Sequence, residues 1–359
     1  MTRAVVTTGA GGGLSVEDVH LAGPEAGQVR VRLVAAGVCH SDLSLHRGTL
    51  PHKTPAVLGH EGAGVVTEVG SGVEHVRAGD HVVLNWRAPC RSCAFCRNGE
   101  PYLCSYSDLV ARKPYGRLAD GTPVHPGLGV AAFAEETVLP ESGVVKVPSD
   151  VPPEVAALLG CAALTGFGAV VNCARVRPGQ SAVVFGVGGV GRIALQTLRL
   201  VGAGTIVAVD ASADKEKAAR QSGATHFLPA SPDLLEEIRE LTDGRGCDHA
   251  IECVGGAATV RQAWDCTRRG GTVTVVGAGG RDDRVSFTAL ELFHSARRLI
   301  GCLHGNATAE RDVPVLLDHV RAGRMDIGAL VSDRIPLDGV AGAFDRLAAH
   351  QGGRSLVLL

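Results

Sequence analysis

The sequence predicts an α/β protein of two domains, a β-rich domain and a doubly wound parallel-sheet domain. At 359 residues the chain is longer than a single core usually supports. Residues 1–155 hold short β-rich runs separated by Gly, Pro and Asp turns, which is typical of a folded-over barrel or sandwich. From residue 156 the pattern changes to strands alternating with helices, as in βαβ units.

The individual elements follow from local pattern. In the first part, four runs predict strands: VRVRLVAAGV (29–38), GAGVVTEVG (62–70), HVVLNW (81–86) and VVKVP (144–148). The second part alternates strands with helices: SAVVFGV (181–187), the helix GRIALQTLRLV (191–201), TIVAVD (205–210), the helix KEKAARQSG (215–223), HAIECVG (249–255) and GTVTVVGAG (271–279). After about residue 300 we expect two helices and a closing strand: 312–326, 339–350 and RSLVLL (354–359).

Composition narrows the class of partner. The formal net charge is −2 and the basic residues are scattered, which argues against nucleic acid or an anionic membrane as a partner and favours a small molecule. The first residues show no charged segment followed by an apolar one, and we find no run of about 18 apolar residues. We therefore expect a cytoplasmic protein.

Four cysteines crowd into the segment CRSCAFCRNGEPYLC (90–104). The total of eleven cysteines is odd and the expected compartment is reducing, so metal binding is a better interpretation than disulfides. Tetrahedral zinc accepts four thiolates, and four protein ligands leave no position for water, which predicts a structural site. The ligands would be Cys90, Cys93, Cys96 and Cys104. Between them, Arg91, Ser92, Asn98, Gly99 and Pro101 favour turns over helix or strand. The alternative is a set of unrelated free or buried cysteines.

A glycine loop follows the first strand of the second part, in VVFGVGGVGRIALQTLRL. Gly186, Gly188 and Gly191 form G-x-G-x-x-G where a strand meets a helix, which allows a tight turn and a close approach of the backbone to a pyrophosphate. Asp210 ends the next strand, where a carboxylate can bind an adenosine ribose and repel a 2′-phosphate. Ala211 and Ser212 supply no arginine for such a phosphate, so NAD is expected over NADP. The alternatives are an ordinary α/β turn, and for Asp210 a cap at the strand end.

Three further segments each contain a thiol or imidazole among small residues: GVCHSD (37–42), GHEGAG (59–64) and GCAALTGFGA (160–169). Singly they are weak signals. Cys39 or Cys161 alone would usually be a buried thiol, and His60 alone a hydrogen-bonded internal histidine.

Together with the cysteine quartet and the glycine loop, these segments resemble the zinc-dependent alcohol dehydrogenases of the medium-chain dehydrogenase/reductase superfamily. The resemblance covers practically the whole chain in the same order. It implies a GroES-like catalytic domain at 1–155 with a structural zinc lobe at 90–104, an NAD-binding Rossmann domain at 156–303, and a return to the catalytic domain at 304–359. It also implies two zinc ions per chain and a homodimer or homotetramer.

By position, the resemblance assigns a catalytic zinc to Cys39, His60 and Cys161, which leaves the fourth position for water or the substrate oxygen. Glu61 would approach the metal, and Asp42 would orient His60 through its other ring nitrogen. Zinc lowers the pKa of a bound hydroxyl and so favours hydride loss from an alcohol.

Ser41 matches the hydroxyl that binds the substrate oxygen and begins a proton relay in this family; otherwise it is a serine in a turn. Ser44 stands where several relatives end the relay with a histidine. His46 could replace that histidine, a ribose hydroxyl and water could suffice, or His46 could be an exposed loop residue.

The resemblance also extends the set of cofactor-binding residues. It adds Gly189 and Val190 of the glycine loop, and Thr165 outside the loop, as residues that would bind the cofactor. His40 and Arg354 would lie near the pyrophosphate, and Lys215 would contact the ribose unless it is simply solvated.

Three stretches look like the mycothiol-dependent formaldehyde dehydrogenases, a pattern that aryl alcohol dehydrogenases share: 81–104, 310–325 and the ending RSLVLL. The expected reaction is hydride transfer between a primary alcohol, or a thiol–formaldehyde adduct, and NAD. The alternatives are an aldehyde or nitrosothiol reductase of the same family and a non-catalytic zinc/NAD redox sensor.

Overall fold

The computed structural model describes residues 1–349 and 351–359, which form two compact units. Unit 1 comprises residues 1–161, 308–318 and 326–359, and unit 2 comprises residues 162–307 and 319–325. The domain boundaries expected from the sequence stay a prediction.

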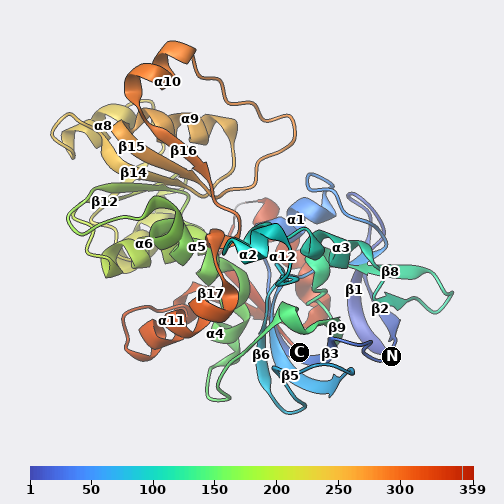
Figure 1. Ribbon diagram of the computed structural model, residues 1–359. Coiled ribbons are helices and arrows are strands. Elements are labelled where there is room, and N and C mark those ends of the chain that lie inside the picture. Colours follow the sequence, from blue (N-terminus) through green and yellow to red (C-terminus); the bar gives the residue numbers. More distant parts are fainter. Residues whose placement is uncertain (350) are drawn as a thin grey trace. The chain divides into compact units, whose positions relative to one another are not determined.

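Unit 1 is built from β-strands in two sheets (Figure 1). One is a closed barrel in the order β1-β2-β7-β8-β4, and the other has the order β10-β6-β5-β3-β18-β17, with β9 also paired to β3. The barrel strands are β1 (Thr2–Thr7), β2 (Leu14–Leu21), β4 (Ala56–Val57), β7 (Gly116–Arg117) and β8 (Pro123–Pro126). The second sheet contains β3 (Gln28–Gly37), β5 (Glu61–Val69), β6 (His81–Leu84), β9 (Glu136–Pro140), β10 (Val144–Lys146), β17 (Val331–Ile335) and β18 (Arg354–Leu358).

Strand β3 organises this second sheet. Its alternation buries Val29, Val31 and Leu33 in the core of unit 1 while Arg30 lies partly exposed on the other side. Its end at Gly37 pairs with Glu61 of β5 on one side and with Leu356 of β18 on the other. Three segments that are distant in sequence therefore meet where β3 ends.

The remaining elements of unit 1 are short. The α-helices are α1 (His40–His46), α2 (Ala94–Arg97), α3 (Tyr106–Arg112), α4 (Pro153–Leu158), α11 (Ala309–Arg321, whose last residues belong to unit 2) and α12 (Val340–Ala348). Single 3₁₀ turns are η1 (Pro101–Leu103), η2 (Gly127–Gly129), η3 (Glu141–Gly143), η8 (Gly328–Leu330) and η9 (Leu337–Gly339). His350, the last residue of the expected helix 339–350, lies outside the described residues.

Unit 2 contains a six-stranded parallel sheet in the order β13-β12-β11-β14-β15-β16. Its strands are β11 (Ala182–Phe185), β12 (Ile206–Asp210), β13 (His226–Pro229), β14 (Cys247–Glu252), β15 (Thr267–Val275) and β16 (Arg298–Gly301). Alternate residues of β11 enter different cores, Ala182 and Val184 one, Val183 and Phe185 the other. Such burial on both faces is expected of a doubly wound parallel sheet, which confirms the predicted fold class.

The helices of unit 2 connect these strands. They are α5 (Leu164–Gly168), α6 (Gly189–Leu200), α7 (Glu216–Gln221), α8 (Leu234–Glu240), α9 (Ala257–Asp265) and α10 (Ala289–Ser295), with 3₁₀ turns η6 (Ala213–Lys215) and η7 (His304–Asn306). Figure 1 labels α5, α6, α8, α9 and α10, and the strands β12, β14, β15 and β16.

One helical run corrects the expectation that no apolar stretch reaches membrane-spanning length. Pro153–Ala174 is long and apolar enough by length and composition, but 89% of its most apolar window is buried. Burial on that scale fits a helix of the protein core. Within the run, η4 (Leu159–Ala163) and η5 (Ala169–Ala174) are wound as π-helix.

The cysteine lobe also differs from the sequence expectation of turns alone. Ala94–Arg97 forms one turn of α-helix and Pro101 begins a 3₁₀ turn. Proline fits the first position of a helix because its missing N–H has no partner to lose there. Asn98 therefore ends α2 and Pro101 begins η1, while Cys96 lies within α2.

Candidate functional site

Four buried side chains of unit 1 converge on one point. The ligand atoms of Cys39, His60, Glu61 and Cys161 all lie within 4.8 Å of one another. Cys39 is the residue at which α1 begins, and Glu61 opens β5 directly after His60. Cys161 lies in the π-helical segment η4, and π-helical turns are frequent at functional sites.

Asp42 holds this cluster in place. Its carboxylate is fully buried and accepts hydrogen bonds from the backbone N–H groups of Gly59 (3.0 Å) and Cys39 (3.3 Å). The Nδ1 atom of His60 lies 2.9 Å from the same carboxylate. Because a carboxylate can only accept, Nδ1 carries the proton and Nε2 is left as the metal-binding nitrogen.

The spacing of the donors fits a tetrahedral ion. His60 Nε2 lies 3.3 Å from Cys161 Sγ. Two such atoms bound to tetrahedral zinc would be about 3.6 Å apart, given bond lengths of about 2.1 and 2.3 Å. Thiolate and imidazole are the ligands that zinc favours in proteins. The donor set therefore fits a zinc ion with three protein ligands and one open position.

Electrostatics supports this assignment. The hydrogen bond with Cys161, together with nearby Arg354, holds the pKa of the Cys39 thiol well below its ordinary value, although burial opposes this. Burial raises the pKa of Glu61 to about 7, against the pull of the Arg354 guanidinium, which donates to Glu61 Oε2 at 2.5 Å. Within the described residues, the other oxygen, Oε1, is buried without a hydrogen-bond partner. A cation at the cluster could coordinate this oxygen.

Two side chains border this cluster of donor residues. Ser41 is partly exposed and its Oγ lies 3.9 Å from Cys39 Sγ. The Trp86 ring stands edge-on to His60, with centroids 6.1 Å apart. Sequence reasoning placed Trp86 only in a strand, whereas β6 ends at Leu84 and leaves the indole beside the cluster. In the sequence, the only signal was an aromatic residue at the end of the predicted strand 81–86.

His46 is held inside unit 1. It lies on the last turn of α1, where Nδ1 is 3.2 Å from Thr7 Oγ1 and the ring packs on Phe344 at 5.6 Å. Burial lowers its pKa, and Arg47 adds to the effect. The alternative of an exposed loop residue is therefore wrong, while its place in a proton relay stays a prediction. Ser44, two residues earlier in α1, is partly buried.

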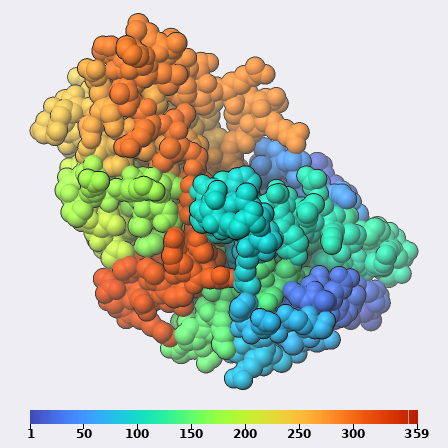
Figure 2. Space-filling view, viewed as in Figure 1, coloured from blue at the N-terminus to red at the C-terminus, as the bar shows by residue number. Residues whose placement is uncertain are grey.

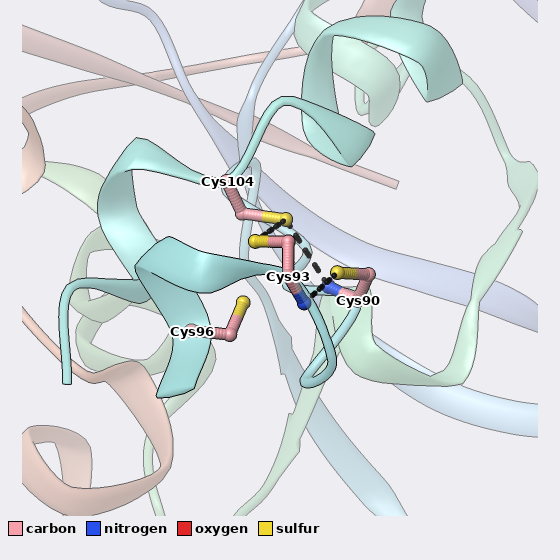
Figure 3. A group of neighbouring side chains, drawn as sticks. All are labelled: Cys90, Cys93, Cys96 and Cys104. Carbon is pink, nitrogen blue, oxygen red and sulfur yellow. Dashed lines mark hydrogen bonds between the residues drawn. The ribbon is translucent and has the colours of Figure 1, made fainter. Parts of the chain in front are cut away.

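The second cluster is the cysteine lobe, in which the sulfurs of Cys90, Cys93, Cys96 and Cys104 point toward a common centre (Figure 3). Cys93 Sγ and Cys104 Sγ are 3.8 Å apart, the separation that two thiolates have on tetrahedral zinc at about 2.3 Å bond length. Backbone N–H groups donate to Cys104 Sγ (from Cys90, 3.3 Å) and to Cys90 Sγ (from Cys93, 3.2 Å). Such bonds orient thiolate ligands and stabilise their charge.

Hydrogen bonds to a cysteine of the lobe favour the thiolate form, which is the form that binds a cation. Bonds from the backbone and hydroxyl of Ser92 and from the Cys93 N–H lower the pKa of the Cys90 thiol to about 6. All eleven cysteines of the chain are free thiols. The quartet therefore fits a closed, structural zinc site, as the sequence spacing predicts.

Arg87 fastens the lobe to the rest of unit 1, a role that sequence reasoning missed. Its buried guanidinium donates to the carbonyl oxygens of Tyr102 (2.9 Å) and Cys104 (3.0 Å) and to Asp108 (2.9 Å). The only sign of this role in the sequence was an arginine directly after the apolar predicted strand 81–86.

In unit 2 the glycine loop joins β11 to α6. Gly186 adopts φ +89°, which is a left-handed conformation that favours glycine, and a Cβ on Gly191 would lie 1.8 Å from the carbonyl oxygen of Gly186. A Cβ on Gly188 would project into open space. That space lies at the start of α6, where a pyrophosphate would meet the first backbone N–H groups of the helix, those of Gly189 and Val190. The loop therefore fits a dinucleotide.

Asp210 ends β12 beside this loop. Its carboxylate accepts hydrogen bonds from the N–H groups of Val187 (2.8 Å) and Ser212 (3.0 Å). The carboxylate is thus both a strand-end cap and a fixed negative charge next to the glycine loop, and its ribose contact stays a prediction.

The other residues expected near the cofactor are distributed over both units. Thr165 is buried in α5, Lys215 ends η6 shortly after Asp210, and His40 is exposed at the start of α1. Arg354 is buried and paired with Glu61 in unit 1. Their cofactor contacts stay predictions.

Fold and sites together define a dehydrogenase of the zinc-containing type, with a structural and a catalytic metal position and a dinucleotide-binding sheet. Two family models match the chain, the alcohol dehydrogenase GroES-like domain over residues 25–149 and the zinc-binding dehydrogenase domain over residues 189–321. The chain belongs to the zinc-dependent alcohol dehydrogenase family of the medium-chain dehydrogenase/reductase superfamily.

Individual relatives agree with this family. The chain is 38% identical to S-(hydroxymethyl)glutathione dehydrogenase of Paracoccus denitrificans, over 99% of each chain. It is 35% identical to a class-3 alcohol dehydrogenase of Cereibacter sphaeroides, again over 99% of each. Benzyl alcohol dehydrogenase of Acinetobacter calcoaceticus has a similar structure, with a TM-score of 0.92, 30% identity and coverage of 100% of this chain and 99% of the other.

Proposed function

We propose that this protein oxidises a primary alcohol, or the hydroxymethyl adduct of formaldehyde with a small thiol, using NAD as hydride acceptor. The observation that carries the proposal is the buried cluster of Cys39, His60, Glu61 and Cys161, in which the two thiols and the imidazole can hold zinc and leave a fourth position for the substrate oxygen. When bound, the zinc ion supplies a Lewis acid that makes an alcohol hydroxyl more acidic. The balanced overall reaction converts the alcohol and NAD⁺ into the carbonyl product, NADH and one proton.

The protein side chains have distinct tasks in this reaction. Asp42 keeps the proton of His60 on Nδ1 and so fixes the ring as a neutral ligand. Ser41, next to Cys39, accepts the proton of the substrate hydroxyl and passes it toward solvent. Trp86 forms an apolar wall beside His60 and excludes water from the substrate. The glycine loop and Asp210 bind NAD.

The relatives suggest two substrate classes. One is named for a hydroxymethyl thiol adduct and another for benzyl alcohol. The decisive experiment is a screen for NADH absorbance with short primary alcohols, benzyl alcohol, and formaldehyde with and without glutathione or mycothiol. A thiol requirement identifies the adduct. NADH production from none of these substrates contradicts the proposal.

A control separates binding from chemistry. His60→Ala removes one ligand of the catalytic cluster but leaves the glycine loop in unit 2 intact. We expect this variant to bind NADH as the wild type does, by fluorescence, and to have no measurable turnover. Turnover by His60→Ala without catalytic zinc would exclude the proposed mechanism.

We also propose that the protein is cytoplasmic and self-associates. Free thiols throughout the chain fit a reducing compartment. Leu290 and Phe293 on α10 are 71% and 82% exposed, and Leu299 on the edge strand β16 is 42% exposed. Figure 2 shows the orange residues of this part of unit 2 at the surface. An apolar surface beside an open strand edge is suited to an interface, and light scattering of the purified protein measures the oligomeric state.

A further inference from the structure

Unit 2 contains a cavity of about 450 Å³ that belongs to neither the metal cluster nor the glycine loop. Its inner wall comes from neighbouring strands, where His249 of β14 pairs with Thr272 of β15, which pairs in turn with Arg298 of β16. The same row continues to Ala182, the first residue of β11. The cavity therefore lies at the amino ends of the strands, whereas the glycine loop follows their carboxyl ends.

The charge of the cavity is one-sided. Arg175, Arg177 and Arg298 line it, and no aspartate or glutamate is among its lining residues in the described part of the chain. All three arginines are exposed, which places the positive charge at the mouth. Three cations without a carboxylate among them favour an anionic ligand.

Two of the residues that line the cavity, His249 and Thr272, carry unpartnered polar atoms. His249 is 4% exposed and Thr272 is 3% exposed. Across residues 1–349 and 351–359, neither His249 Nδ1 nor Thr272 Oγ1 finds a hydrogen-bond partner. Buried polar atoms of this kind are normally satisfied, so each is a place for a ligand to bind.

The hydrogen bonding fixes what His249 can recognise. Gln180 Oε1 accepts from the Arg177 N–H at 2.8 Å, which identifies this atom as the amide oxygen. His249 Nε2 lies 3.0 Å from the same oxygen and must therefore donate to it. Burial lowers the pKa of His249 to about 4, so the ring is neutral and Nδ1 is a bare acceptor. The atom facing Nδ1 must carry a hydrogen.

We propose that this cavity binds a phosphate-type oxyanion that keeps a hydroxyl, either free hydrogen phosphate or the head of a small phosphate ester. The arginines at the mouth pair with its charged oxygens, its hydroxyl donates to His249 Nδ1, and Thr272 Oγ1 donates to a second oxygen. A fully deprotonated oxyanion such as sulfate lacks the hydroxyl and leaves Nδ1 buried without a donor. The site thus distinguishes anions by whether they carry a hydroxyl hydrogen as well as by their charge.

Calorimetric titration of the zinc-loaded protein saturated with NADH tests this proposal, because the dinucleotide then occupies the glycine loop. Inorganic phosphate, glycerol 3-phosphate and sulfate are compared at neutral pH and constant ionic strength. We expect saturable binding of phosphate or its ester, with sulfate at least about tenfold weaker. The tighter of the first two identifies the source of the anion. Failure of both to bind, or equal binding of sulfate, overturns the proposal.

Variants locate the site. Arg298→Gln and the nearly isosteric Thr272→Val should each weaken phosphate binding roughly tenfold, whereas Arg284→Gln, an exposed arginine outside the cavity, should leave it unchanged. If Arg298→Gln has a lowered melting temperature, Arg177→Gln replaces it as the test of the arginine contacts. Wild-type affinity in both arginine variants overturns the assignment.

The thiol of Cys173 gives a readout that is independent of calorimetry. This partly buried residue lines the cavity. Bound phosphate should lower the alkylation rate of this thiol in proportion to the fraction of sites occupied. Mass spectrometry of the Cys173 peptide measures the rate. An alkylation rate that saturating phosphate leaves unchanged counts against the proposal.

Discussion

Replacing Asp42 by Asn tests whether this carboxylate assembles the catalytic metal cluster. The substitution keeps the side-chain shape but removes the charge and one acceptor oxygen, while the N–H groups of Gly59 and Cys39 and the His60 ring still need acceptors. Loss of the partner that orients a metal-bound histidine typically lowers metal affinity by 10–100-fold. That range corresponds to about 1.4–2.8 kcal/mol of binding free energy.

The assay is competition for zinc with a chromogenic chelator, read together with elemental analysis. We expect Asp42→Asn to keep the lobe zinc and to release the second zinc at a 10–100-fold lower chelator concentration than the wild type. Asp333→Asn is the matched control, because Asp333 pairs with Arg346 at the surface. Unchanged affinity at the second zinc in Asp42→Asn would refute the reasoning.

Asp42→Ala differs from Asp42→Asn in removing every acceptor. It leaves two buried backbone donors unsatisfied, which costs roughly 2–6 kcal/mol of unfolding free energy at about 1–3 kcal/mol for each. The alanine variant should therefore lose stability as well as zinc, and the asparagine variant mainly zinc. Chemical denaturation of both variants separates these two effects.

Three further predictions address the remaining sites. Cys93→Ser should lower the zinc content from two ions per chain to one and lower the melting temperature, whereas Cys173→Ser, outside the lobe, should keep both ions; two ions in Cys93→Ser would contradict the closed site. Asp210→Ala should weaken NAD and reduce the discrimination against NADP, because a carboxylate beside the loop repels a 2′-phosphate, and steady-state kinetics with both cofactors measures the ratio. Ser41→Ala should keep its zinc yet slow alcohol oxidation about a hundredfold, and Ser41→Thr should be mild; a wild-type rate in Ser41→Ala would exclude the hydroxyl from proton transfer.

Elements with a strong local pattern could be predicted from the sequence. The strand β11, the glycine loop and α6 follow from an apolar run, a glycine pattern and a helical period. The cysteine quartet is equally local, and its four thiols do converge. The ligands Cys39 and Cys161 required the family resemblance, because neither segment is a signal alone.

Other features depend on contacts that no local pattern records. The pair of Arg354 and Glu61 joins residues 293 positions apart. The π-helical winding around Cys161 has the same apolar composition as an ordinary buried helix. The anion cavity needs His249, Thr272 and Arg298 in one register, and strand register is set by tertiary pairing.

The pairing of Arg354 with Glu61 has a consequence for biosynthesis. The ribosome makes Glu61 early and Arg354 only after all of unit 2, so in the nascent chain the Glu61 carboxylate has no cationic partner until the last residues are made. Burying an unpaired charge is costly, and unit 1 therefore gains its finished form only when β18 docks beside β3. Unit 2 is free to fold first, and the catalytic metal is expected to load after translation is complete.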